Sequence, residues 1–201
     1  MTARVEWLTV GGAVEPWQRL GLVVHEGLIP LFGTGIRVAS DAEPGIVGWA
    51  LSGLAEVASE IDGLPTAVVD PGPPIFAEHP AGAIGLDHVV VTTDSLERTC
   101  QAIEAATGAP LRRVREAGTM RQGFHRMGGL IVEVVERAGL PEGQATFWGL
   151  VINVEDLDAA VARLGADLVG APKPAVQSGR SIATVQESAG LGLPVALMTP
   201  G

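Results

Sequence analysis

Residues 85–97 read GLDHVVVTTDSLE, and the same pattern returns at residues 146–158 as TFWGLVINVEDLD. In each copy an apolar run typical of a buried strand leads into an acidic segment typical of the start of a helix. A related segment also lies downstream of each copy. The first copy is followed by GLIVEVV at residues 129–135, and the second is followed by GLPVALM at residues 192–198. The chain therefore contains one supersecondary unit twice.

The first copy of the unit predicts the order βαβββ. A strand at 88–92 is followed by a helix that Asp94 can cap, with Glu97 reaching back as in a capping box, and that ends near Gly108. Three strands are then expected at 111–116, 120–127 and 130–135, because glycine residues separate them. Cys100 lies on the apolar face of the helix, which favours a buried and inert thiol over a catalytic one.

The second copy predicts the same order over residues 147–199. A strand at 148–154 precedes a helix in which Leu157, Val161 and Leu164 recur at helical spacing. A loop rich in Gly and Pro then leads to strands at 181–186 and 193–198.

The first 80 residues resemble a shortened pair of the same units. Strands are expected at 5–10, 35–39 and 45–53, with a short helix beginning at Glu15 and a longer one carrying Leu54, Val57, Ala58 and Ile61 on one face. In this alignment Trp7 corresponds to His88, and Ala39 corresponds to Glu133. The Pro-rich segment 71–85 is the natural boundary between the halves. We therefore predict an α+β fold of paired βαβββ modules, with a degenerate lobe at 1–82 and a well formed domain of two modules at 83–201.

The two complete copies differ at two positions that can carry chemistry. His88 in the first copy corresponds to Gly149 in the second, and Glu133 corresponds to Ala196. Imidazole and carboxylate bind divalent metals and also transfer protons, whereas glycine and alanine do neither. The second copy therefore lacks both groups.

The βαβββ module, opened by Leu-Asp-His-Val at 86–89 and closed by Ile-Val-Glu-Val at 131–134, resembles the vicinal oxygen chelate superfamily. This superfamily includes glyoxalase I, extradiol dioxygenases, methylmalonyl-CoA epimerase and bleomycin-resistance proteins. The segments Arg-Gln-Gly-Phe at 121–124 and VQSGRSIATV at 176–185 look like a set of uncharacterised bacterial glyoxalase-like proteins. The resemblance implies that the paired modules curl into open barrels, in which each module contributes a metal ligand from its first strand and another from its last.

Carried over by position, the resemblance marks only His88 and Glu133 as metal ligands. A divalent cation usually needs three or four protein ligands, so a third would have to come from Gln122, His125 or His79. The alternative is that His88 and Glu133 form a hydrogen-bonded polar pair across the sheet, which can also act as a general acid and base. A divalent metal thus stays open as a cofactor.

A cluster of arginines lies in the segment between the two marked residues. Arg113 and Arg115 share one face of their strand, whereas Arg121 and Arg126 point to opposite faces if their strand has no bulge. Arginine presents a planar fork that suits carboxylate and phosphate, so Arg113 and Arg121, together with Gln122, are candidate ligand-binding residues. Exposed arginines that pair with nearby glutamates are the alternative.

A further candidate lies in the turn at 177–181, where Gly179 allows a tight bend. This bend can deliver Gln177 and Arg180 to the mouth of the barrel as ligand-binding residues. A plain hairpin is the alternative. The four tryptophans, at 7, 17, 49 and 148, are expected in the core or between the lobes.

The composition limits the partners. A net charge of −10 in 201 residues argues against nucleic acid and against an anionic membrane surface. The longest charge-free run, residues 188–201, is broken by Gly190, Gly192 and Pro194, and the N-terminus lacks the apolar core of a secretory signal. We therefore expect a cytoplasmic protein, and a homodimer is one arrangement that the sequence allows.

Two functional hypotheses follow. The first is an enzyme of the glyoxalase and dioxygenase type, an isomerase, lyase or dioxygenase that acts on a small anionic metabolite through His88 and Glu133. The second is a non-catalytic protein that sequesters a ligand, similar to the bleomycin-resistance proteins. The first requires both residues to point into an accessible cleft, whereas the second tolerates their burial as a structural pair.

Overall fold

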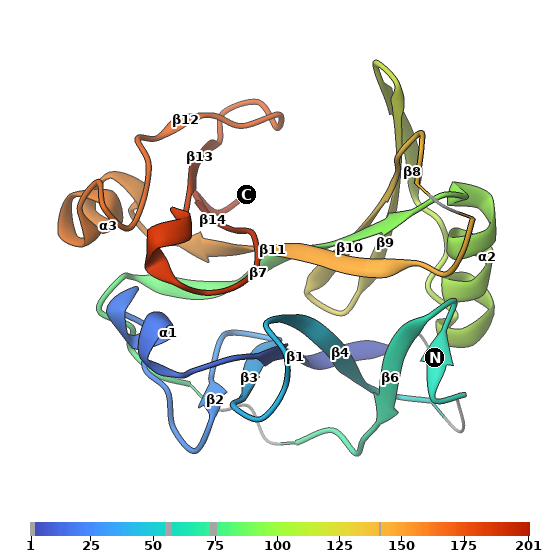
Figure 1. The fold of residues 1–201 in the computed structure, drawn as a ribbon, viewed down its shortest axis with the longest axis horizontal. Coiled ribbons are helices and arrows are strands. Elements are labelled where there is room, and N and C mark those ends of the chain that lie inside the picture. Colours follow the sequence, from blue (N-terminus) through green and yellow to red (C-terminus); the bar gives the residue numbers. More distant parts are fainter. Residues whose placement is uncertain (1–2, 55–57, 73–75, 141) are drawn as a thin grey trace.

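The computed structural model describes residues 3–54, 58–72, 76–140 and 142–201. The chain forms two sheets with few helices, which confirms the predicted α+β class (Figure 1). In the part of the chain that is described, no helix is long and apolar enough to span a membrane.

The first lobe is a six-stranded sheet in the order β2-β3-β1-β4-β6-β5. Its elements are β1 (Arg4–Gly11), α1 (Glu15–Arg19), β2 (Leu28–Ile29), β3 (Gly35–Ala39), β4 (Gly45–Ser52), β5 (Glu60–Ile61) and β6 (Leu64–Val68). The short helix expected at Glu15 is confirmed. The helix expected to reach Ile61 is wrong at its end, where a short strand is formed instead, and Val57 lies outside the described residues.

The second lobe is an eight-stranded sheet in the order β12-β13-β14-β11-β7-β10-β9-β8. Its first module contains β7 (Ala83–Thr93), α2 (Leu96–Thr107), β8 (Arg113–Ala117), β9 (Met120–Met127) and β10 (Leu130–Glu136). Its second module contains β11 (Thr146–Val154), α3 (Leu157–Leu164), β12 (Lys173–Pro174), β13 (Ser181–Thr184), a 3-10 turn (Glu187–Ala189) and β14 (Val195–Met198). Both copies thus have the predicted βαβββ order.

The two modules are joined along their first strands. β7 pairs antiparallel with β11, and each of these strands pairs in parallel with the last strand of its own module, β10 or β14. The sheet rises at both of its ends and leaves a trough between them, with α2 and α3 on its outer sides (Figure 1). This curvature places the concave face over the junction of β7 and β11.

The first helix of this lobe begins one residue later than predicted. Ser95, not Asp94, is the N-cap and accepts a hydrogen bond from the backbone N–H of Arg98 at 3.4 Å. Asp94 pairs with the Arg98 side chain at 2.8 Å, and Glu97 pairs with Arg121 instead of reaching back. In the second module Asp156 occupies the matching cap position, because Leu157 starts the helix as Leu96 does.

The two lobes share a core. One cluster of buried apolar side chains includes Leu8, Trp49 and Leu51 from the first sheet and Val89 and Ile152 from the second. The rings of Trp49 and Phe147 meet edge to face at 5.3 Å across the junction. Because apolar burial is the main source of stability, the lobes support one another.

Candidate functional site

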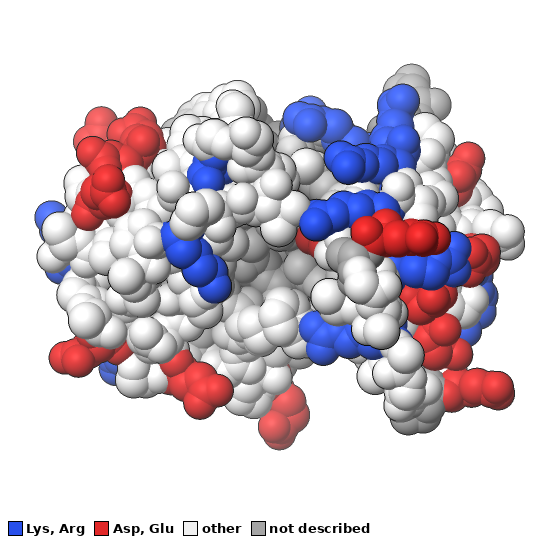
Figure 2. Space-filling model, turned by 90° about the horizontal axis from the view of Figure 1, so that it is seen from above, with Lys and Arg blue, Asp and Glu red and all other residues white. Residues whose placement is uncertain are grey.

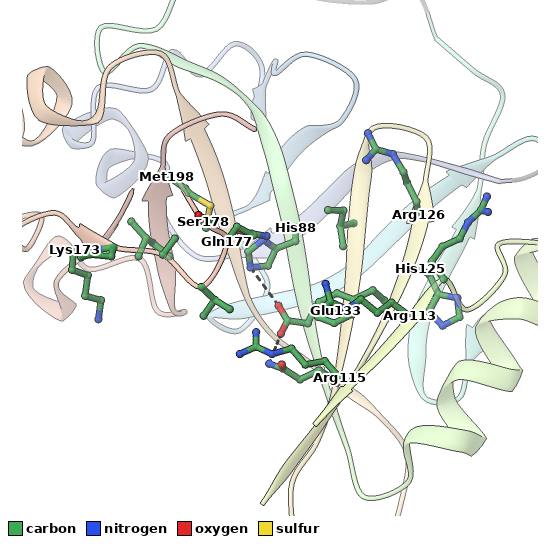
Figure 3. Close-up of a pocket in the computed structure, with 18 residues that line it drawn as sticks. His88, Arg113, Arg115, His125, Arg126, Glu133, Lys173, Gln177, Ser178 and Met198 are labelled. Atoms are coloured by element: carbon green, nitrogen blue, oxygen red, sulfur yellow. Dashed lines mark hydrogen bonds and ion pairs between the residues drawn. The ribbon is translucent and has the colours of Figure 1, made fainter. Parts of the chain in front are cut away.

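A cavity of about 870 Å³ lies on the concave face of the eight-stranded sheet. Its volume is within the usual range for small-molecule sites, about 300 to 1,000 Å³. His88 and Glu133 lie on its floor, and residues 173–178 line one side (Figure 3). Gln122 also lines the cavity. Four arginines also line the cavity, at positions 112, 113, 115 and 126.

His88 reaches the cavity because β7 contains a bulge. Leu86 pairs with Ile152 and His88 pairs with Val151, so Asp87 has no partner on β11. The bulge sends Leu86 into the core and His88 to the concave face. His88 is 13% exposed, which leaves its ring accessible from the cavity.

The imidazole of His88 lies between two carboxylates. Its Nδ1 atom is 2.7 Å from Asp87 Oδ1, and its Nε2 atom is 3.5 Å from Glu133 Oε2 (Figure 3). An ionised Asp87 holds a proton on Nδ1, since a carboxylate can only accept a hydrogen bond. The Nε2 atom is therefore the one that can exchange a proton with Glu133 or with a ligand.

Glu133 comes from β10, the strand beside β7. Burial raises the pKa of its carboxyl above the usual 4.5, and the nearby positive charges of His88 and Arg115 oppose this rise without cancelling it. Gln122 of β9 donates its amide N–H to Glu133 Oε1 at 2.7 Å. The second oxygen faces His88, so the arrangement favours one proton shared between Glu133 and His88.

Asp87 is held on its other side by Arg180. The Nη2 atom of Arg180 donates to Asp87 Oδ2 at 2.6 Å and to Asn153 Oδ1 at 2.7 Å. Burial alone would raise the pKa of Asp87, but hydrogen bonds from His88 and Arg180 outweigh it and lower this pKa to about 2. Asp87 is thus ionised at neutral pH, and it is the site residue that the sequence analysis missed, although it directly precedes His88.

Arg180 does not line the cavity. Its side chain is 11% exposed and also donates to the backbone carbonyl of Thr199, so it joins the turn before β13 to β7 and to the C-terminal segment. Gln177, the other residue predicted from this turn, does line the cavity. The turn therefore supplies one residue to the cavity wall and one to the support of Asp87.

The arginines divide between the two faces of the sheet. Arg113 and Arg115 lie on the cavity side of β8, and Arg126 lies on the cavity side of β9. Arg121 lies on the opposite face and pairs with Glu97 at 2.6 Å and with Glu136 at 3.5 Å, so the structure does not bring it to the predicted ligand site. Figure 2 shows basic side chains gathered beside the hollow of this face.

The cavity arginines carry charge that no acidic side chain neutralises directly. Across residues 3–54, 58–72, 76–140 and 142–201, no carboxylate lies within 4.0 Å of the guanidinium of Arg113, Arg115 or Arg126. Lys173 adds a fifth cationic side chain to the lining. In a chain of net charge −10, this local excess of positive charge is suited to an anionic ligand.

The residues present do not fit a divalent-metal site of three or four protein ligands. His88 and Glu133 are two donors, and no group of three His, Cys, Asp or Glu side chains in the described chain could hold a metal ion. His125 is among the residues that line the cavity, but its ring turns toward α2, with Nδ1 2.9 Å from the Ala109 carbonyl, and burial lowers its pKa (Figure 3). His79 does not line the cavity, and both of its ring nitrogens are engaged, Nδ1 by the Val23 N–H and Nε2 by the Pro30 carbonyl. Neither histidine supplies the third ligand, and Gln122 turns its N–H toward Glu133.

The second module has no side chains equivalent to His88 and Glu133, and its backbone leaves no space for one at the position of His88. Position 196, which corresponds to Glu133, is in a small apolar cluster with Val151 and Met198. A Cβ atom at Gly149 would lie 2.6 Å from the carbonyl oxygen of Pro194, so no side chain fits there. The difference between the copies is therefore built into the backbone at Gly149.

No family model matches the sequence, and no curated protein matches it. Solved structures do match. Methylmalonyl-CoA epimerase from Mycobacterium tuberculosis is 16% identical with a TM-score of 0.51, covering 63% of this chain and 93% of the epimerase chain. A triple mutant of 4-hydroxymandelate synthase from Streptomyces coelicolor is 14% identical with a TM-score of 0.65, covering 100% of this chain and 93% of the synthase chain. Both share the paired βαβββ architecture, and the chain has the fold of the vicinal oxygen chelate superfamily.

Proposed function

We propose that the concave cavity binds a small anionic molecule and that His88 and Glu133 transfer a proton on it. One observation carries this proposal. An imidazole and a carboxyl of raised pKa lie 3.5 Å apart on the floor of a cavity whose rim holds arginines without acidic partners. Perturbed carboxyls in clefts are frequent catalytic groups.

Each part of the site has a role in the proposed reaction. Arg113 and Arg115 bind the carboxylate or phosphate of the substrate and polarise the adjacent carbonyl. Glu133, when ionised, removes a proton from the carbon next to that carbonyl, and the electron pair of the C–H bond moves into an enolate. His88 returns a proton from Nε2 to the same carbon of the enolate, and Glu133 then passes its proton to His88. The product is an isomer or epimer of the substrate, and no oxidant is consumed.

Gln122 supports this chemistry in a second way. Its Oε1 atom is buried and has no hydrogen-bond partner among the described residues. An unpaired buried acceptor is costly, and a donor on the ligand, such as a hydroxyl, would satisfy it. We therefore expect a ligand with a hydroxyl or N–H group near its reacting carbon to bind more tightly than one without such a donor.

An isomerase is favoured over a dioxygenase of the same fold. Dioxygenase chemistry relies on a bound redox metal, and among the described residues His88 and Glu133 have no third His, Cys, Asp or Glu side chain beside them that would complete a metal site. The first of the matched structures is named an epimerase, which agrees with proton transfer, although the likeness itself extends to the fold alone.

A sequestering protein is the second candidate. The part of the wall that the second module supplies includes the apolar side chains of Ala175, Ile182 and Met198, and such a surface can hold a ligand without acting on it. In this case the Arg113 side chain would still bind the anion, but His88 and Glu133 would serve only as a polar pair. The cytoplasmic location and the homodimer stay predictions.

Calorimetric titration with 2-oxobutyrate, methylmalonate and inorganic phosphate tests the ligand class. We expect binding of at least one of these anions, and Arg113→Gln should weaken it by about tenfold or more, because a charge-assisted hydrogen bond contributes roughly 1.5–3 kcal/mol. Arg121→Gln removes an arginine of the same segment from the other face and should leave the affinity unchanged. Equal losses in both variants, or none in either, would contradict the proposed site.

A further inference from the structure

A second cavity lies in the first lobe, on the face that corresponds to the concave face of the second lobe. Its volume is about 310 Å³, near the lower end of the range for ligand sites. Trp7, Arg37 and Arg4 line it, and Phe76 of the connecting segment lies at its edge. None of these residues belongs to the site of His88 and Glu133.

The strand registers show that the two cavities occupy equivalent positions. In the first lobe Val5 pairs with Leu51 and Trp7 pairs with Ala50, so Glu6 forms a bulge on β1. In the second lobe Leu86 pairs with Ile152 and His88 pairs with Val151, so Asp87 forms the same bulge on β7. Trp7 therefore stands at the position of His88, as the sequence alignment predicted.

In the first lobe Arg37 occupies the position equivalent to Glu133, so the alignment of Ala39 with Glu133 was wrong. Glu133 pairs with Val90, two residues after His88, and Arg37 pairs with Thr9, two residues after Trp7. The sequence alignment matched glycines and was displaced by two residues. The first lobe thus repeats the geometry of the site with an indole and a guanidinium in place of an imidazole and a carboxyl.

The side chains of Trp7 and Arg37 contact each other, and both stay accessible to a ligand. The guanidinium of Arg37 lies 4.8 Å from the centre of the Trp7 ring, within the range of a cation–π contact. Arg37 is exposed and Trp7 is half-buried. Across the described residues no carboxylate lies within 4.0 Å of Arg37 or Arg4.

Among the described residues that line this cavity, the single acidic side chain, Glu6, is already engaged. Glu6 accepts a hydrogen bond from the hydroxyl of Ser52 through Oε1. The rest of the described lining includes the apolar side chains of Leu28, Pro30, Leu31 and Phe76, and Thr34, whose hydroxyl already donates to the Val5 carbonyl. Two guanidinium groups beside one carboxylate leave a local excess of positive charge.

We propose that this cavity binds a small aromatic carboxylate. The Trp7 ring, with Arg37 over one face, and the exposed Phe76 ring, which stacks on Phe32 at 6.0 Å, each keep a second face on which an aromatic ring can stack. Arg37, held over Trp7, presents its planar fork to a carboxylate, and Arg4 supplies a second cation. The small volume favours a ligand of one or two fused rings over a nucleotide.

Fluorine NMR of protein labelled with 5-fluorotryptophan tests the proposal directly. The chain has four tryptophans, and Trp7→Phe identifies the Trp7 resonance by its loss. We expect indole-3-carboxylate to shift the Trp7 resonance in a saturable manner, while acetate, which lacks a ring, and indole, which lacks a carboxylate, do so at much higher concentrations. No shift with indole-3-carboxylate at millimolar concentration would overturn the proposal.

Variants separate this cavity from the site of the second lobe. Arg37→Gln should weaken the effect of indole-3-carboxylate on Trp7 by about tenfold or more, since it removes the charge-assisted contact. Arg113→Gln should leave that effect unchanged. Arg4→Gln provides a second test if Arg37→Gln lowers the thermal midpoint. Unchanged affinity in properly folded Arg37→Gln, or a parallel loss in Arg113→Gln, would place the ligand elsewhere.

Discussion

Asp87 connects the proposed proton-transfer pair to the rest of the molecule. It accepts hydrogen bonds from His88 on one oxygen and from Arg180 on the other, and it is 7% exposed. In this arrangement Arg180 positions Asp87, and Asp87 fixes the tautomer and the orientation of His88. The sequence predicted His88 and Arg180, the two ends of this chain of contacts, but not Asp87, which lies between them.

Removal of Arg180 tests its supporting role. Arg180→Ala leaves a buried carboxylate without its cation, and we expect a loss of roughly 2–4 kcal/mol in the free energy of unfolding. Arg121→Ala is the matched control, because its partner Glu97 is exposed, and it should cost less than about 1 kcal/mol. Urea unfolding at pH 7 measures both. A loss as small for Arg180→Ala as for the control would remove Arg180 from the network.

The lowered pKa of Asp87 predicts a dependence of stability on acid. A carboxyl whose pKa falls from 3.8 unfolded to about 2 folded stabilises the protein above pH 4, and this contribution is lost as the pH drops through 2. Its size is of the order of 2 kcal/mol. Urea unfolding between pH 6 and pH 2 should therefore show a steeper loss for the natural protein than for Asp87→Asn. Parallel curves would contradict the contacts of Asp87.

His88 and Glu133 could be predicted as candidate site residues because the chain contains a second copy of the same unit, in which glycine and alanine stand at their positions. The face of each arginine was harder to predict. Strand alternation placed Arg113 and Arg115 together and separated Arg121 from Arg126, as the structure confirms. Nothing in the pattern showed which face was concave, so Arg121 was assigned to the wrong side. Arg180 was assigned to the cavity because glycine predicts a turn without predicting what the turn packs against.

Two glycines control how closely the strands approach at the module junctions. A Cβ atom at Gly149 would lie 2.6 Å from the Pro194 carbonyl oxygen, and one at Gly48 would lie 2.9 Å from that of Pro65. The two positions are equivalent, since Gly149 pairs with Val90 and Gly48 pairs with Thr9. Both lobes thus use the same Gly–Pro contact beside the first strand of a module.

Gly149→Ala should therefore destabilise the protein by roughly 1–3 kcal/mol, because the added methyl group meets backbone that has to move. Gly129→Ala is the control, since no atom lies within 4 Å of its added Cβ and its φ is not in the left-handed region. Thermal unfolding compares the two. A stable Gly149→Ala would mean that the contact with Pro194 is looser than described.

The elements themselves were largely predictable, because hydrophobic periodicity and helix caps are local signals. β9 matches its predicted bounds, whereas β13 and β14 are shorter than predicted, ending at Thr184 and beginning at Val195. The bulges at Glu6 and Asp87 could not be predicted, since a bulge is a property of two paired strands. The alignment of Ala39 with Glu133 failed for a different reason, because it matched Gly35 with Gly129, whereas the strand register makes Gly35 equivalent to Ile131.

At the scale of the whole molecule, we propose that residues 1–82 and 83–201 are two lobes of one cooperative unit. Their buried side chains form one cluster. Arg98 of α2 also bonds Asp62 of the first lobe at 2.9 Å, and Ala145 donates its backbone N–H to the Asp62 carbonyl at 2.8 Å. These contacts cross the boundary between the lobes in both core and surface.

We expect the full chain to unfold in one transition, with coincident curves from tryptophan fluorescence and far-ultraviolet circular dichroism. A fragment of residues 83–201 would expose Val89 and Ile152, so it should bind a hydrophobic dye and unfold without a sharp transition. Trp49→Ala, which removes the contact with Phe147, should lower the midpoint of the full chain for both probes equally. A fragment as cooperative as the full chain would show that the lobes are independent.

The central claim is that His88 and Glu133 transfer a proton on a bound anion with the side chains that the site itself provides. Incorporation of solvent deuterium into the carbon-bound positions of 2-oxobutyrate or methylmalonate, followed by NMR after dialysis against EDTA, tests it most directly. We predict exchange by the natural protein, a fall of about 10²- to 10⁴-fold in Glu133→Gln, and no change in Arg121→Gln. Binding of these anions without any exchange, or exchange that returns only when a divalent metal is added, would contradict the claim.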